Sequence, residues 1–148
     1  MADKFNSLAD LLVAALGNKL RPFETFGQLF TEDAQFTFPF APEGTPSQLS
    51  GRSAIVDHLT RLGPLIDFGN FTLKAVYHQG DTTIFEASCK GQGTETGLAY
   101  DQDYISVITT RDGQIANYAD YWNPLILIHA LGGQQALRLA YAKAGHVS

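Results

Sequence analysis

The feature that most constrains the fold is a pair of long, strand-like segments joined at Asp112-Gly113. Residues 98–111 and 114–122 are rich in β-branched and aromatic residues, and Asp-Gly between two such runs is a strong signal for a tight β-hairpin. The second segment ends at Asn123-Pro124, where Asn is a favoured helix N-cap and Pro a favoured first helical residue. The sequence therefore predicts a long hairpin that leads directly into a helix ending at Gly132.

Two carboxylates stand within this hairpin among apolar and aromatic residues. Because alternate side chains of a strand face the same side, Asp120 shares a face with Tyr118 and Trp122. By the same alternation Asp103 shares a face with Ile105, and we expect this face also to point inward. A carboxylate in such surroundings is either a structural acid with hydrogen-bond partners or a functional group in a ligand-binding or catalytic pocket.

The composition restricts the class of protein. With 148 residues, of which 45% are hydrophobic and 17% charged, the chain is predicted to form one domain over residues 1–148. A net charge of −5 disfavours nucleic acid or an anionic membrane as a partner. No segment resembles a signal peptide or a membrane span, and the single cysteine, Cys89, excludes an internal disulfide. We therefore expect a reducing, cytoplasmic setting.

The remaining segments alternate between helical and strand-like patterns. Helices are predicted over residues 2–16, 50–63 and 134–145, with a short helix opening at Pro22 and a turn at residues 31–33. Strands are predicted over residues 34–40, 71–77 and 82–90, and Pro39 requires the first of them to be an edge strand or to leave the sheet there. This order predicts an α+β fold, in which a strongly bent, cone-shaped antiparallel sheet wraps over the N-terminal helices.

Four short motifs stand out along the chain: LFTEDAQFTFP at residues 29–39, GRSAIVDHL at 51–59, YISVITTRDGQIANYADYWNP at 104–124 and ALG at 130–132. Together they resemble the nuclear transport factor 2-like superfamily, in particular its SnoaL-like branch. The last two are similar to the tail of the phenazine-biosynthesis A/B proteins. The resemblance implies a cystatin-like α+β barrel, which serves isomerases, epoxide hydrolases, polyketide cyclases, dehydratases and non-catalytic binding proteins.

The resemblance also implies roles for individual residues. Asp120 stands where limonene-epoxide-hydrolase-like enzymes have an acid and phenazine A/B proteins a catalytic glutamate. Asp103 stands where ketosteroid isomerases keep a neutral, hydrogen-bond-donating aspartic acid. The isomerase base and the hydrolase asparagine are both replaced by Phe38, and the isomerase tyrosine is replaced by Leu12. The arginine of the hydrolase Arg-x-Asp pair is absent, because Asp101 occupies that position.

Two carboxylates in an apolar cone favour acid/base chemistry without a cofactor. Desolvation raises the pKa of a carboxyl group, which can then stay protonated near neutrality and donate a proton or a hydrogen bond. We therefore expect Asp120 to be the acid/base and Asp103 its partner or an oxyanion donor, in a lyase, isomerase or cyclase acting on a small apolar or aromatic molecule. The expected ligand-binding residues are Phe26, Phe36, Phe38, Phe40, His78, Tyr100, Tyr118 and Trp122.

A second function remains open, that of a non-catalytic ligand-binding or dimerisation module in which Phe38 fills the catalytic site. A ligand-sized cavity behind Phe38, with Asp120 facing into it, would favour the enzyme. No metal is expected, because the four histidines are scattered without chelating spacing. These are His58, His78, His129 and His146, of which His58 is expected to face solvent.

A homodimer is predicted through the outer face of the hairpin. If Asp103 and Ile105 face the cone, then Tyr104, Ser106, Ile108 and Tyr121 must face outward. Such a face is too apolar to remain in water, and self-complementary pairing about a two-fold axis is the commonest solution.

Overall fold

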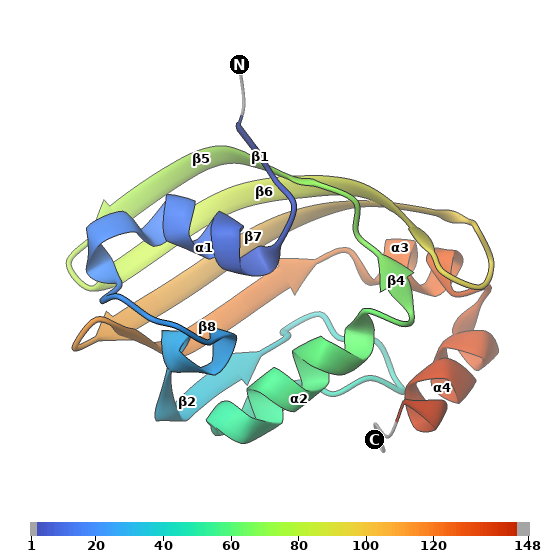
Figure 1. The fold of residues 1–148 in the computed structure, drawn as a ribbon. Helices are drawn as coiled ribbons and strands as arrows, with labels where there is room; N and C mark the ends of the chain where they lie inside the picture. Colours follow the sequence, from blue (N-terminus) through green and yellow to red (C-terminus); the bar gives the residue numbers. More distant parts are fainter. Residues whose placement is uncertain (1–2, 145–148) are drawn as a thin grey trace.

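The computed structural model describes residues 3–144, which form one strongly curved sheet with helices α1 and α2 against its concave side (Figure 1). The strands are β1 (Asp3–Phe5), β2 (Phe30–Thr37), β3 (Gln48–Ser50), β4 (Ile66–Asp67), β5 (Phe71–Gln79), β6 (Thr82–Gly93), β7 (Ala99–Arg111) and β8 (Gln114–Trp122). The helices are α1 (Leu8–Leu16), α2 (Arg52–Leu62), α3 (Pro124–Ala130) and α4 (Gln134–Lys143), with short 3-10 turns η1 (Gly17–Lys19) and η2 (Phe26–Leu29). The strand order is β1-β5-β6-β7-β8-β2-β3, and β4 pairs with β6. The predicted α+β class and curved sheet are confirmed.

The central hairpin forms where it was predicted. Asp112 and Gly113 adopt φ angles of 53° and 79°, which suit the two central positions of a tight hairpin turn. The strands β7 and β8 that flank this turn are antiparallel. The Asn123 side chain caps α3 by accepting a hydrogen bond from the Leu125 amide at 2.9 Å, and Pro124 occupies the first turn. The helix start therefore fixes the end of β8.

The first aromatic strand differs from the prediction in its start and its pairing. Residues 31–33 are part of β2 and not a turn. Asp33 lies exposed on this strand and forms an ion pair with Arg111 at 2.7 Å. β2 also pairs with β8 in parallel, so the prediction of an antiparallel sheet is wrong for this pair. The chain leaves the sheet after Thr37, two residues before Pro39, as the proline required.

The N-terminal helix is shorter than predicted. Ser7 caps α1 by accepting a hydrogen bond from the Asp10 amide at 3.1 Å, and the preceding residues Asp3–Phe5 pair with β5 instead. The helix expected from Pro22 is only the 3-10 turn η2. Helices α2 and α4 lie where predicted. Residue 2 of the predicted N-terminal helix and residue 145 of the predicted last helix are outside the described residues. Within residues 3–144, no helix has both the length and the apolar character needed to span a membrane.

A β-bulge in the hairpin decides which side chains face the concave side. Arg111 pairs with Gln114, and continuing that register would place Asp120 opposite Ile105. The register shifts by one between Thr109 and Thr110, so that Asp120 stands opposite Ser106. A shift of one residue exchanges the two faces of a strand. The even-numbered residues of β7 therefore face inward, and the predicted assignment of Asp103 and Ile105 to the concave face is wrong.

Candidate functional site

The concave face of the sheet and the helices enclose a cavity of about 680 Å³. Most of its wall is apolar, with contributions from α1, α2, α4 and the long strands. The predicted wall residues Phe26, Phe36, Phe38 and Trp122 all line it, together with Phe71 and Phe85. A cavity of this size and character suits a small organic ligand.

Two of the predicted ligand-binding residues lie elsewhere. Phe40 is 58% exposed and packs against Tyr121, because the strand alternation that predicted an inward side chain ends at Thr37. His78 is exposed near the end of β5, where its Nδ1 lies 2.8 Å from the Thr83 hydroxyl oxygen. Neither side chain lines the cavity.

Asp120 faces the cavity from β8, as predicted. Its carboxylate Oδ1 accepts a hydrogen bond of 3.2 Å from the Ser106 hydroxyl, and the residue is partly buried. Desolvation raises the pKa of Asp120 to about 7, and the hydrogen bond from Ser106 lowers it only in part. Both protonation states of this carboxyl are therefore populated near neutrality.

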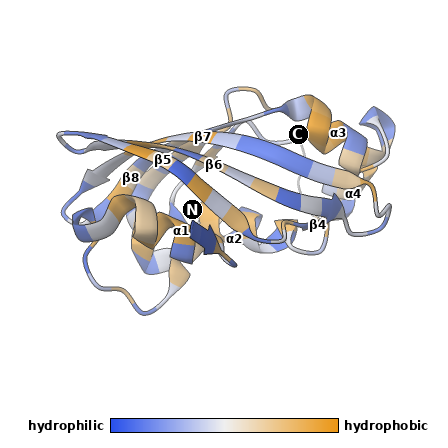
Figure 2. Ribbon diagram, turned by 90° about the horizontal axis from the view of Figure 1, so that it is seen from above, coloured by the Kyte–Doolittle hydropathy of each residue, from blue (hydrophilic) through white to orange (hydrophobic). Residues whose placement is uncertain are grey.

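Asp103 does not belong to the site. Its side chain is 79% exposed, and its carboxylate forms an ion pair with Lys74 at 3.2 Å. The bulge described above accounts for this position, because it turns Asp103 to the convex side. The expectation that Asp103 is a catalytic partner of Asp120 is therefore wrong. Figure 2 shows that the long strands carry hydrophilic stretches toward the end at which α3 and α4 stand.

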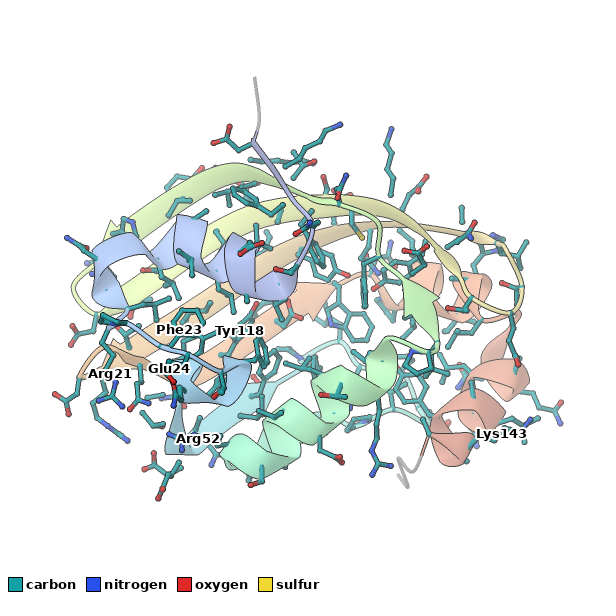
Figure 3. All side chains as sticks on the ribbon, viewed as in Figure 1. Arg21, Phe23, Glu24, Arg52, Tyr118 and Lys143 are labelled. Atoms are coloured by element: carbon teal, nitrogen blue, oxygen red, sulfur yellow. The ribbon has the colours of Figure 1, made fainter. Side chains whose placement is uncertain are left out.

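The aromatic residues beside Asp120 form a connected wall. Tyr118 stacks on Phe36 with ring centroids 4.1 Å apart, and Figure 3 shows it in the interior while Arg21, Arg52 and Lys143 lie at the periphery. Phe38 packs against Phe36 at 4.9 Å and Trp122 at 6.0 Å. Phe38 is thus one wall of the cavity and leaves a ligand-sized space behind it.

His58 is buried and lines the cavity, so the prediction that it faces solvent is wrong. Its ring packs against Phe38, with centroids 5.4 Å apart. The signal was present in the sequence, because His58 follows Ile55 by three positions and precedes Leu62 by four, which is the spacing of one helix face. This face of α2 is turned toward the sheet.

Tyr100 lines the cavity as predicted, and it does so together with Tyr104, which the sequence had placed outside. The two hydroxyl oxygens lie 2.9 Å apart, so that one phenol donates a hydrogen bond to the other. Desolvation raises the pKa of both phenols well above the usual value. Both therefore remain protonated over the physiological range.

Gln102 is a buried residue that sequence reasoning missed. Its amide nitrogen donates to the Asn123 carbonyl at 2.9 Å, and its amide oxygen accepts from the backbone N–H groups of Asn123 at 2.9 Å and Asp103 at 3.1 Å. Gln102 thereby ties the end of β8 and the start of α3 to β7. Asp120 makes no such contact, so it does not hold the helix start.

Replacing Gln102 with Leu is expected to destabilise the fold by roughly 2–4 kcal/mol, because it leaves buried backbone groups without partners. Urea denaturation of the variant and the wild type measures this difference. Gln79→Leu is the matched control, because Gln79 is an exposed residue at the end of β5 and should change stability by less than about 0.5 kcal/mol. Equal losses in both variants would contradict the assigned role of Gln102.

The described residues contain no metal-binding cluster of three His, Cys, Asp or Glu side chains, while His146 lies outside them. The part of the cavity wall that the structure describes also contains no lysine or arginine. Cys89 is buried in the core, where desolvation raises the pKa of its thiol to about 11. The polar side chains that line the described part of the cavity carry carboxyl, hydroxyl, amide and imidazole groups.

Comparison with known proteins supports a family assignment. Residues 12–118 match the model of the SnoaL-like domain. The uncharacterized protein YesE of Bacillus subtilis is 45% identical over 115 residues, which are 76% of this chain and 78% of YesE. The uncharacterized PhzA/B-like protein PA3332 of Pseudomonas aeruginosa is 41% identical over 110 residues, which are 73% of this chain and 77% of that protein.

Solved structures agree with this assignment. A Bacillus subtilis protein proposed to be an isomerase superposes with a TM-score of 0.72 at 42% identity, over 85% of this chain and 91% of that one. More distant structures, described as nuclear transport factor 2-like or ketosteroid isomerase-like, share the fold. The chain has this fold and belongs to the SnoaL-like family.

Proposed function

We propose that this protein binds a small, mainly apolar molecule in the cavity and that Asp120 transfers a proton on it, as in a cofactor-independent isomerase, lyase or cyclase. The observation that carries the proposal is the Asp120 carboxyl, which opens into an apolar cavity and has a pKa raised to about 7. A similar Bacillus subtilis structure is proposed to be an isomerase, which agrees with this reaction class.

The surroundings of Asp120 suit general acid/base catalysis. A group with a pKa near the working pH offers both a proton acceptor and a proton donor at useful concentration. The Ser106 hydroxyl donates to Oδ1 of the carboxylate and thereby orients it toward the cavity. The remaining carboxylate oxygen, Oδ2, is then the atom that takes a proton from the ligand and returns it.

Binding without catalysis is the second candidate function. The observation that favours it is Phe38, a buried ring at the position where the resemblance places a catalytic base. In that case Asp120 would be only a polar wall residue, and the cavity would carry or sense its ligand.

Hydrogen exchange distinguishes the two functions without knowledge of the natural substrate. The wild type is incubated in D₂O with a panel of small apolar ketones, and proton NMR follows the loss of the C–H signals next to the carbonyl. Proton transfer by Asp120 predicts exchange well above the buffer rate. Ligands that raise the melting temperature with concentration but exchange no faster than in buffer would instead support binding alone.

We also propose a homodimer through the convex face of the sheet, with residues that differ from those expected. Because paired positions share a face, Tyr77, Ile84 and Val107 form one row across the strands, and Ile105 and Tyr121 form the next. Tyr104, Ser106 and Ile108 lie on the opposite, concave face. The two rows are mainly apolar and partly exposed, as a self-complementary interface requires. Glu86, which pairs with Ile105, accepts a hydrogen bond from the Tyr77 hydroxyl on this face.

Ile105→Lys is expected to convert this dimer to a monomer, because each interface would then bury two lysines close to the two-fold axis. Light scattering after size exclusion, at micromolar concentration, measures the mass. Leu139→Lys is the matched control, because Leu139 is also an exposed apolar residue and lies on α4. A monomeric wild type, or an Ile105→Lys variant that keeps the dimer mass, would contradict the proposed interface.

A further inference from the structure

Asp120 lies within an aromatic cluster on the cavity wall. Tyr118 and Trp122 precede and follow it by two residues on the same face of β8, about 7 Å along the strand on either side. Phe36 of the neighbouring strand β2 pairs with Tyr118, and Phe38, just beyond that strand, packs against Trp122 with ring centroids 6.0 Å apart. All five side chains line the cavity. A ligand group in contact with the carboxyl therefore lies among aromatic rings.

The wall offers carboxyl groups without a basic side chain to match them. Asp67 and Asp120 line the cavity, and the part of its wall that the structure describes has no lysine or arginine. The hydrogen bond that Asp120 accepts comes from the Ser106 hydroxyl, which supplies a dipole and not a counter-charge. Burial makes the ionised carboxyl unfavourable, and a nearby positive charge stabilises it. A ligand that carries such a charge therefore compensates the desolvation of the carboxylate.

The aromatic rings add a second attraction for a cation. The face of an aromatic ring carries negative partial charge and attracts a cation within about 6 Å of its centroid, most strongly in tryptophan. Aromatic cages recognise quaternary ammonium groups in this way. The net charge of −5 also favours the approach of a cation over that of an anion. A carboxylate among aromatic rings thus matches an ammonium ion better than a neutral group of the same shape.

We propose that the cavity binds lipophilic amines in their cationic form, with the ammonium group against the Asp120 carboxylate and among the rings of Tyr118, Trp122 and Phe38. The apolar part of the ligand fills the rest of the cavity, toward Phe71 and Phe85. The inference rests on the binding part of the proposed function and names its ligand class. The bound cation holds Asp120 as the carboxylate, which is the proton-accepting state.

The other titratable side chains of the described wall bear on how this binding varies with pH. They are His58, Asp67, Tyr100, Tyr104, Tyr118 and Tyr141. Desolvation raises the pKa of the four phenols above the usual value, so they stay neutral near pH 7 and pH 8. His58 and Asp67 are the same in the wild type and in Asp120→Asn. A comparison of these two proteins therefore isolates the Asp120 carboxyl.

Three probes of nearly equal shape test the proposal: (2-naphthylmethyl)trimethylammonium, its neutral carbon analogue 2-neopentylnaphthalene and the anion 2-naphthylmethanesulfonate. Equilibrium dialysis at low probe concentration measures binding through the fluorescence of the naphthalene ring. At pH 8 the wild type is expected to bind the ammonium at least about tenfold more tightly than the carbon analogue, because the charge pair and the cation–π attraction act together. The sulfonate is expected to bind more weakly than either.

Two variants assign the preference to the carboxyl and to the rings. Asp120→Asn is expected to bring the ammonium-to-carbon affinity ratio at pH 8 to within about threefold, the share of the rings alone. Trp122→Leu should also lower the ratio, and the carbon analogue corrects for the lost apolar surface. Asp103→Asn is the matched control, because it removes an exposed carboxylate on the convex face and should leave the ratio unchanged.

Proton release gives a second measurement, which a purely structural role of Asp120 would not produce. Because the pKa of Asp120 is about 7, a bound cation ionises its protonated fraction and releases about half a proton per ligand at pH 7. Calorimetric titrations of the ammonium in two buffers with different heats of ionisation measure this release. Asp120→Asn should abolish it, and Asp103→Asn should not.

The outcomes separate the ammonium site from the proposed catalysis. A ratio near one in the wild type, tighter binding of the sulfonate, an unchanged ratio in Asp120→Asn or Trp122→Leu, or binding without proton release would overturn the site. These results leave proton transfer on a neutral ligand standing. Absence of binding by all three probes would overturn both the site and the binding role. Tight ammonium binding without hydrogen exchange into ketones would refute proton transfer by Asp120 and leave the ammonium site standing.

Discussion

Asp120→Asn is expected to slow hydrogen exchange into a bound ketone by at least about a hundredfold while changing ligand affinity by only a few-fold. General acid/base catalysis by a positioned side chain contributes about this factor or more. An asparagine amide has nearly the shape of the carboxyl group and can still accept a hydrogen bond from Ser106, but it does not exchange protons at neutral pH. The geometry of the cavity is therefore kept while the proton carrier is lost.

The measurement compares NMR exchange rates of 2-acetylnaphthalene in D₂O at saturating ligand. Asp103→Asn is the matched control, because it makes the same chemical change at an exposed carboxyl on the convex face. Its exchange rate should equal that of the wild type. Exchange that persists in Asp120→Asn, or that is lost in Asp103→Asn, would show that another group carries the proton.

The parts of the fold that the sequence predicted well depend on local signals. Asp112-Gly113 supplies the positive φ angles of a hairpin turn, and Asn123-Pro124 supplies a helix cap, whatever the rest of the chain does. Asp120 could be placed for the same reason, because it lies three residues before that cap, on a face with two aromatic residues.

The face of β7 could not be predicted, because both of its faces carry large apolar residues. Tyr104 and Ile108 on one side and Ile105 and Val107 on the other give no clear alternation. The bulge near Thr109 decides which face of β7 points inward. Neither strand has a glycine there that would have indicated a bulge. Because this one-residue shift in register could not be detected in the sequence, Asp103 was expected inside the site and Tyr104 outside it.

Contacts between segments that are far apart in the chain also could not be predicted from the sequence. The parallel pairing of β2 with β8 joins segments separated by about 80 residues, and only the assembled sheet reveals it. Gln102 was overlooked because a polar residue between two aspartates resembles a solvated strand end. Its burial depends on Asn123, which provides the backbone groups that satisfy its amide.

The stability of the wild type is expected to fall as the pH rises from about 4 to about 7, by an amount that Asp120→Asn removes. In the unfolded chain the pKa of Asp120 is near 3.8, and in the folded protein desolvation raises it to about 7. The folded state therefore binds more protons between these values, and stability decreases with pH wherever the folded state is the better proton binder. The difference between the two pKa values corresponds to roughly 4 kcal/mol, present in full only above pH 7.

Urea denaturation at pH 5 and pH 8 measures this effect as a difference between the wild type and Asp120→Asn. Other titrating groups cancel in that difference. Hydrogen bonds from Thr31 and Arg111 lower the pKa of Asp33 below its ordinary value, so its contribution to stability changes only at more acidic pH and is the same in both proteins. The variant should gain stability relative to the wild type on going from pH 5 to pH 8, with unchanged slopes against urea. Parallel pH profiles would mean that the Asp120 carboxyl titrates like an exposed acid, and such a group would be fully ionised and unable to act as a proton donor at neutral pH.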